Sequence, residues 1–140
     1  MRRQASRELL APRADVWAFL AEPHHLPDWW PVIRGVQPDR RGFATDARWQ
    51  VMALQRRPLV GSRDPKPSVL VVGAVEEPER WSWHLTGDLP LDVDVRLDAA
   101  GEARTRVTIA VEGSRLANPK RLARSAADRL YDLVQTAAEL

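Results

Sequence analysis

Apolar and polar positions separate almost completely along the last part of the chain, residues 118–140. Arranged as a helix, the segment has apolar residues on one half and charged or polar residues on the other, which indicates an amphipathic helix lying on a core. Asn118 is a favourable N-cap, and Pro119 suits the first helical position, where a missing N–H costs nothing. At about 1.5 Å per residue this helix would be roughly 33 Å long.

The apolar half of this predicted helix brings little volume to a core. Five of its nine residues are alanines, and the others are Leu122, Leu130, Leu133 and Val134. Because protein interiors are close-packed, other groups must fill the space beneath such a helix. Two interpretations follow: large side chains from a facing sheet, or a bound ligand.

The hydrophobic period is helical near the start of the chain and then changes to two. Residues 12–22 have an i, i+3, i+4 apolar pattern, which predicts a short helix. Residues 22–31 contain three prolines, which predict at most one helical turn before extended chain. Alternating or valine-rich patterns then predict strands at residues 48–54, 68–76, 81–86, 91–98 and 105–111.

Alternation of apolar and charged residues along the later strands indicates a sheet with one covered face and one face in water, as in antiparallel sheets. The order is a strand, short helices, several antiparallel strands and one long amphipathic helix. This order predicts an α+β helix-grip fold, in which a curved antiparallel sheet wraps around a long C-terminal helix, with two short helices after the first strand.

Composition is that of one globular domain over residues 1–140, with 44% hydrophobic residues. The absence of cysteine excludes disulfides, cysteine nucleophiles and thiolate metal sites. No run of about 18 apolar residues occurs, so membrane insertion is not predicted. The arginines near Met1 are followed by no apolar segment of the kind found in signal peptides, so export is not predicted either. We therefore expect a cytoplasmic protein.

Charge gives no sign of a nucleic-acid partner. The formal net charge is only +2, with acidic and basic residues interleaved along most of the chain. The one local excess of basic residues lies at 55–66, among prolines and a glycine, and this composition predicts a loop. Since neither a basic stripe nor a known nucleic-acid-binding module occurs, we expect no nucleic acid as a partner.

Three segments carry a family resemblance: APRADVWAFL at residues 11–20, LPDWWP at 26–31 and EPERWSW at 77–83. Over essentially the whole chain, the sequence resembles the SRPBCC superfamily of START-like and birch-pollen-allergen-like helix-grip domains, and within it the bacterial polyketide cyclase/dehydrase-like branch. The resemblance implies a cavity between the sheet and the C-terminal helix, which in relatives holds lipids, polyketides or other apolar molecules. It implies no shared catalytic residue.

Tryptophan is abundant, with six residues in 140. Its large, rigid ring and single N–H donor suit the wall of a pocket for a flat or elongated apolar ligand. Alternatively, the same rings fill the volume that the alanine-rich helix leaves open, and Trp17 is predicted to serve packing alone. The predicted ligand-binding residues are Trp29, Trp30, Trp49, Trp81 and Trp83, with Ala126, Leu130 and Leu133 on the helix.

Candidate catalytic residues are few. His84 lies on the polar phase of its strand and is expected to face solvent, although a β-bulge that shifted the phase would make it the best acid–base candidate. Asp28 and Arg34 would lie at the cavity entrance or on the surface. His24 and His25 are adjacent and would point about 100° apart on a helix, and no set of Asp or Glu ligands accompanies them at a useful spacing, so no metal site is predicted. Without a phosphate- or dinucleotide-binding glycine motif, no cofactor is expected.

Three functions remain open at this point. The first is binding of a small hydrophobic or aromatic molecule between the sheet and the C-terminal helix. The second is an enzyme of the cyclase or dehydratase type that uses the same cavity without a metal or nucleotide cofactor. The third is an interaction module that docks a protein partner through an exposed Trp29–Trp30 pair. Either a monomer or a homodimer is compatible with the sequence.

Overall fold

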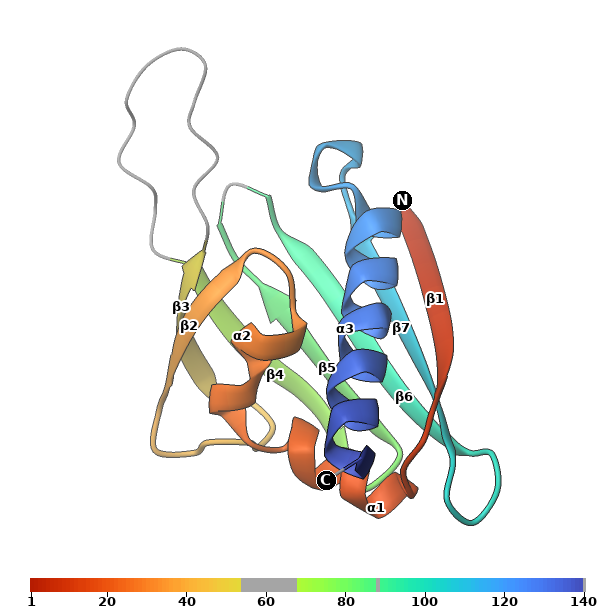
Figure 1. Ribbon diagram of the computed structural model, residues 1–140. Helices are drawn as coiled ribbons and strands as arrows, with labels where there is room; N and C mark the ends of the chain where they lie inside the picture. The colour runs from red at the N-terminus through yellow and green to blue at the C-terminus, as the bar shows by residue number, and fades with distance from the viewer. Residues whose placement is uncertain (54–67, 88, 140) are drawn as a thin grey trace.

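A seven-stranded antiparallel sheet forms the body of the protein in the computed structural model (Figure 1), which describes residues 1–53, 68–87 and 89–139. The spatial order of the strands is β1-β7-β6-β5-β4-β3-β2, so that β1 and β2 form the two edges. The strands are β1 (Arg2–Leu9), β2 (Ile33–Pro38), β3 (Arg48–Ala53), β4 (Ser68–Glu76), β5 (Arg80–Leu85), β6 (Leu91–Ala99) and β7 (Thr105–Gly113).

Helical segments occupy two places in the chain order. Between β1 and β2 lie α1 (Arg13–Leu20), the 3-10 turn η1 (Pro23–His25) and α2 (Leu26–Trp29); after β7 come the 3-10 turn η2 (Arg115–Ala117) and α3 (Pro119–Glu139). Helix α3 packs against β1, β7 and α2, and it crosses one face of the sheet (Figure 1). The arrangement confirms the predicted helix-grip fold.

The strands predicted from periodicity are confirmed, since β3 to β7 begin and end within two residues of the predicted bounds. The predicted loop at residues 55–66 lies outside the described residues. The expectation of at most one helical turn in residues 22–31 is wrong, because η1 and α2 follow one another there. Pro23 is the first residue of η1 and Pro27 the second of α2, and in the first turn of a helix a proline breaks no hydrogen bond.

Asn118 begins α3 in the way the sequence predicts. Its side-chain oxygen accepts a hydrogen bond from the backbone N–H of Arg121 at 3.4 Å, and its carbonyl accepts one from Leu122 at 3.1 Å. The residue has a left-handed backbone with φ 53°, a conformation that asparagine tolerates better than most residues. Asn118 therefore both ends η2 and caps α3.

The core beneath the helices is dominated by indole rings. Ala123, Ala126 and Ala127 of α3 are buried but small, whereas the largest fully buried side chains are Trp29, Trp30, Trp49 and Trp81. All of these belong to one contiguous hydrophobic cluster. Tryptophan thus supplies the volume that the alanines of α3 lack. Among the described residues, no helix has the length and apolar character needed to cross a membrane.

Candidate functional site

Two tryptophans of β5 point into the core. Burial alternates along the strand, so Trp81 and Trp83 are 1% and 2% exposed. Successive strand residues face opposite sides of the sheet, which places Ser82 and His84 on the outer face. No phase shift occurs within β5 itself, because its pairing with β6 is continuous from Arg80 to Leu85.

Two further tryptophans reach the core from α2 and its end. Trp29 is the last residue of the helix, and Trp30 is extended, with φ −90° and ψ 123°. A residue before proline is driven to extended conformations, so Pro31 ends the helix at this point. The change of backbone separates the two adjacent rings, which lie 87° apart in plane with centroids 6.0 Å apart.

These four rings contact one another in a closed cycle, which we call the tryptophan quartet (Trp29, Trp30, Trp81 and Trp83). Besides the Trp29–Trp30 contact, centroid distances are 6.2 Å for Trp29–Trp81, 4.8 Å for Trp30–Trp83 and 6.0 Å for Trp81–Trp83. Distances of this size are favourable for aromatic pairs. The quartet therefore joins α2 to the middle of the sheet.

The polar atoms of the quartet are unusual. All four indole Nε1–H groups are buried and have no hydrogen-bond partner among the described residues. A buried donor without an acceptor costs about 1–3 kcal/mol, and native proteins contain few such groups. Four of them gathered in one cluster of side chains identify the quartet as the candidate site.

Trp49 of β3 differs from the quartet because a backbone carbonyl accepts a hydrogen bond from its indole N–H. Its ring lies 5.8 Å from that of Trp81, yet its Nε1–H donates to the Gly42 carbonyl at 2.7 Å. The ring of Phe43, the residue after this glycine, lies between those of Trp81 and Trp17, with centroid distances of 4.8 Å and 5.6 Å. Sequence reasoning missed Phe43, which stands alone in a polar segment and belongs to no periodic pattern.

The predicted ligand-binding residues of α3 adjoin the same core. Ala126 and Leu130 are fully buried members of the cluster, and Leu133 packs against it while remaining partly exposed. Leu133 also lines an apolar pocket of 390 Å³ between α1 and the last turns of α3. The other residues of this pocket are Leu10, Ala11, Pro12, Asp15, Val16, Phe19 and Val134.

The expectation that Trp29 and Trp30 form an exposed pair is wrong, as both side chains are 0% exposed. Their contacts with Trp81 and Trp83 hold them inside the fold. A protein partner cannot reach them without opening α2, so the interaction-module hypothesis loses its anchor. Leu26 and Ile33, which flank the pair in the sequence, are buried as well.

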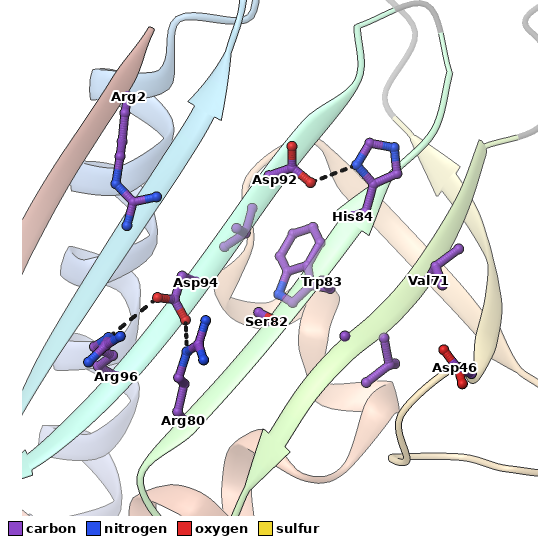
Figure 2. Close-up of a pocket in the computed structure, with 13 residues that line it drawn as sticks. Arg2, Asp46, Val71, Arg80, Ser82, Trp83, His84, Asp92, Asp94 and Arg96 are labelled. Carbon is purple, nitrogen blue, oxygen red and sulfur yellow. Dashed lines mark hydrogen bonds and ion pairs between the residues drawn. The ribbon is translucent and has the colours of Figure 1, made fainter.

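The three candidate catalytic residues are not brought together. His84 faces outward, as predicted, with its Nδ1 2.8 Å from an Asp92 carboxylate oxygen (Figure 2). Asp28 is exposed on α2, which covers the inner face of the sheet. Arg34 is exposed on β2, three strands from β5, a separation of about 14 Å at the usual strand spacing.

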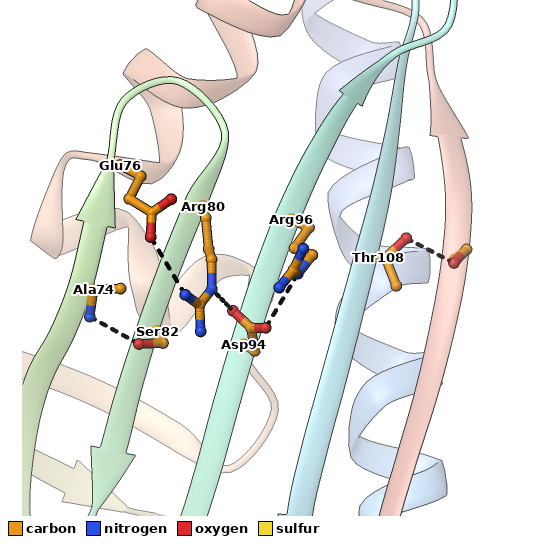
Figure 3. A network of polar contacts seen from close by, with 8 residues as sticks. Ala74, Glu76, Arg80, Ser82, Asp94, Arg96 and Thr108 are labelled. Carbon is orange, nitrogen blue, oxygen red and sulfur yellow. Dashed lines mark hydrogen bonds and ion pairs between the residues drawn. The ribbon is translucent and has the colours of Figure 1, made fainter.

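The outer face around His84 is a hollow of 490 Å³, and its lining includes a network of paired charges (Figure 2). Arg80 donates to Asp94 at 2.9 Å and to Glu76 at 3.3 Å, and Arg96 donates to the second oxygen of Asp94 at 3.4 Å (Figure 3). The hydrogen bond to Asp94 is the main cause that raises the pKa of Arg80. Because these charges neutralise one another, the network connects β4, β5 and β6 rather than attracting a charged ligand.

Gly73 and Ser82 form the floor of this hollow. The pairing of β4 with β5 shifts between Val72 and Val75, and the backbone N–H of Ala74 donates to Ser82 Oγ at 2.8 Å (Figure 3). The bulge that sequence reasoning considered for this region therefore lies in β4 and leaves His84 outside. In the described part of the chain, no group of three or more His, Asp or Glu side chains could hold a metal ion.

Comparison with known proteins agrees with this architecture. A family model described as "Polyketide cyclase / dehydrase and lipid transport" matches residues 2–137. No curated protein sequence matches the chain.

Solved structures share the fold at low sequence identity. A START superfamily protein from Mycobacterium smegmatis superposes with a TM-score of 0.69 at 14% identity, covering 97% of this chain and 98% of that one. The di-domain ARO/CYC StfQ of the steffimycin biosynthetic pathway gives 0.71 at 15% identity, over 98% of this chain and 46% of StfQ. A Deinococcus radiodurans protein gives 0.69 at 18% identity, with both chains covered completely.

Proposed function

Because the chain belongs to the polyketide cyclase / dehydrase and lipid transport family, we propose that it binds a small hydrophobic or aromatic molecule between the sheet and α3. The predicted tryptophans, together with Ala126, Leu130 and Leu133, form the walls of this site. Burial of apolar surface, at about 25 cal/mol per Å², supplies most of the affinity. Polar contacts set the orientation of the ligand.

The observation that carries this proposal is the set of four buried indole N–H groups without partners among the described residues. An apolar molecule with carbonyl or ether oxygens would offer acceptors to these donors while its body replaces contacts between the rings. Since each unpaired donor is costly when buried, a ligand that accepts hydrogen bonds gains more from the quartet than a hydrocarbon of the same shape.

Access to the site is proposed at the end of the fold where α1 meets the last turns of α3. The pocket there is predominantly apolar, with Asp15 as its one charged side chain. It shares Leu133 with the predicted site, and Val16 and Val134 connect its wall to the core cluster. A ligand entering here would meet apolar side chains before it reached the quartet.

The proposal does not include catalysis by the predicted acid–base residues. A cyclase or dehydratase needs a proton-transfer group near the bound substrate. His84 lies on the opposite face of the sheet from Trp81 and Trp83, and Asp28 and Arg34 are exposed. Binding, rather than turnover through these residues, is therefore the function that the geometry supports best.

Titration of the intrinsic tryptophan fluorescence tests the proposal directly, with anthraquinone and anthracene as a matched pair of flat probes. Anthraquinone offers two carbonyl acceptors, so we expect saturable quenching and at least about fivefold tighter binding than for anthracene, the equivalent of one net hydrogen bond of about 1 kcal/mol. Ala126→Trp and the milder Ala126→Leu should weaken binding of both probes, whereas Ala18→Leu, at an exposed position of α1, should not.

Either of two results would contradict the proposal. One is the absence of saturable quenching by both probes. The other is unchanged affinity in Ala126 variants whose circular dichroism shows that they remain folded. Equal affinity for anthraquinone and anthracene would instead retain the binding site but remove the role of the indole donors.

A further inference from the structure

One end of the molecule combines an exposed aliphatic side chain with a concentration of positive charge. The end lies where β7 passes through η2 into α3 (Figure 1). Leu116 in η2 is 73% exposed, which makes it the most exposed large hydrophobic side chain in the described part of the chain. Leu89, which is 36% exposed, belongs to the β5–β6 connection at the same end, because Leu91 pairs with Gly113.

The positive charge lies in the same segment of the chain as Leu116. Residues 113–127 contain Arg115, Lys120, Arg121 and Arg124 and no acidic residue, and all four side chains are exposed. None of them forms a salt bridge within the described ranges, in contrast to Arg7, Arg13, Arg80, Arg96 and Arg104. We call Arg115, Leu116, Lys120, Arg121 and Arg124 the basic tip.

Two of these cations occupy places that are unfavourable for the helix. The N-terminus of an α-helix carries partial positive charge and is stabilised by acidic residues. The first turn of α3 has no acidic residue and instead carries Lys120 and Arg121. Like charges therefore accumulate in one short segment whose cations form no salt bridge among the described residues, and an anionic partner would offset this repulsion.

We infer that the basic tip docks onto an anionic lipid surface. Clustered Lys and Arg side chains are attracted to anionic headgroups, and an exposed leucine between them inserts among the acyl chains. The aliphatic side chain favours a bilayer over a nucleic acid, whose phosphate backbone is contacted by cations and hydrogen-bond donors. This surface is separate from the quartet and lies at the opposite end of α3 from the proposed access pocket, so the inference goes beyond the proposed ligand binding.

Vesicle co-sedimentation tests the inference with the full chain. We expect binding to phosphatidylcholine vesicles that contain phosphatidylglycerol, loss of binding at high salt, and little binding to pure phosphatidylcholine. Removing or reversing a cation near a membrane changes binding by about fivefold per charge, so Lys120→Glu/Arg121→Glu should lower the partition coefficient by well over tenfold. Leu116→Ser should lower it several-fold without changing the net charge.

The matched control is Arg40→Glu/Arg129→Glu, which makes the same change in net charge at two exposed positions outside the basic tip. It should retain most of the binding. The Lys120 and Arg121 reversals place acidic groups where the helix dipole favours them, so loss of fold is not expected, and circular dichroism verifies this.

Three results would overturn the inference: no sedimentation with anionic vesicles, an equal loss in the control variant, or tighter binding to duplex DNA than to the vesicles together with no effect of Leu116→Ser. None of these results depends on the ligand, so the proposed function is tested separately by the fluorescence titration.

Discussion

Replacing Trp81 or Trp49 with phenylalanine tests whether the quartet donors lack partners in solution. Both residues are fully buried in the same aromatic cluster, and both substitutions remove the same atoms. The difference lies in the indole N–H, which is unpartnered in Trp81 and donates to Gly42 in Trp49. Comparing the two variants therefore cancels the packing change and leaves the hydrogen bond.

The expected magnitudes follow from these environments. Loss of roughly 40 Å³ costs about 1 kcal/mol in either variant, at about 24 cal/mol per Å³. Trp49→Phe also loses a net hydrogen bond of about 1 kcal/mol and leaves a part-buried carbonyl without its donor, which brings the total to about 2–3 kcal/mol. Trp81→Phe removes a donor whose burial costs about 1–3 kcal/mol, so its total effect is near zero or stabilising.

Urea unfolding followed by far-ultraviolet circular dichroism measures both values without relying on tryptophan emission. We expect Trp49→Phe to be less stable than Trp81→Phe by about 2–5 kcal/mol, or roughly 7–17 °C in Tm for a domain of this size. Equal destabilisation of the two variants would mean that the Trp81 N–H is hydrogen-bonded in the folded protein in solution, and would contradict this prediction.

Three further substitutions test the structural account. Asn118→Ala should destabilise the protein by about 1–2 kcal/mol through loss of the cap and strain at positive φ, whereas Asn118→Gly should cost only a few tenths; equal losses in thermal melts would contradict the assigned backbone. A Cβ at Gly73 would lie 2.7 Å from Ser82 Oγ, so Gly73→Ala should displace the hydrogen bond from Ala74 N–H to Ser82 Oγ and lower the free energy of unfolding by about 1 kcal/mol. In a Ser82→Ala background, where this hydrogen bond is absent, Gly73→Ala should cause almost no further loss of stability. The Arg48 backbone N–H is the main group that holds the pKa of Asp39 below its usual value. The stabilisation from this hydrogen bond is present above the usual pKa and is lost as the pH falls through the lowered pKa. Between pH ~5 and pH ~2, the free energy of unfolding in urea should therefore fall more for the wild type than for Asp39→Asn. Parallel losses would exclude that role for Asp39.

Local patterns in the sequence predicted most of the fold. Strands β3 to β7 and helix α3 follow from periods of two and 3.6, because one face of each element must be covered. The cap at Asn118 follows from side-chain chemistry that acts within four residues. The helical content of η1 and α2 was underestimated, because a proline is compatible with the first turn of a helix but breaks its interior. The residue type alone does not distinguish these two positions.

The candidate site could be predicted only in part. The tryptophans that compose it were identified from their strands and segments, but the burial of Trp29 and Trp30 depends on contacts with β5, about fifty residues later in the chain. The hydrogen-bonding state of each indole is likewise a tertiary property. Trp49 finds the Gly42 carbonyl because the β2–β3 connection passes beside it, and no periodic pattern encodes that path.

The quartet N–H groups are proposed to donate hydrogen bonds to a bound ligand. Proton–nitrogen correlation NMR of the indole Nε1–H resonances, recorded with and without anthraquinone, observes these donors individually. We expect large downfield proton shifts in the resonances of the tryptophan quartet and smaller ones for Trp49, whose N–H already has an acceptor. Unchanged quartet resonances at saturating anthraquinone, or shifts confined to Trp17 and Trp49, would contradict this proposal.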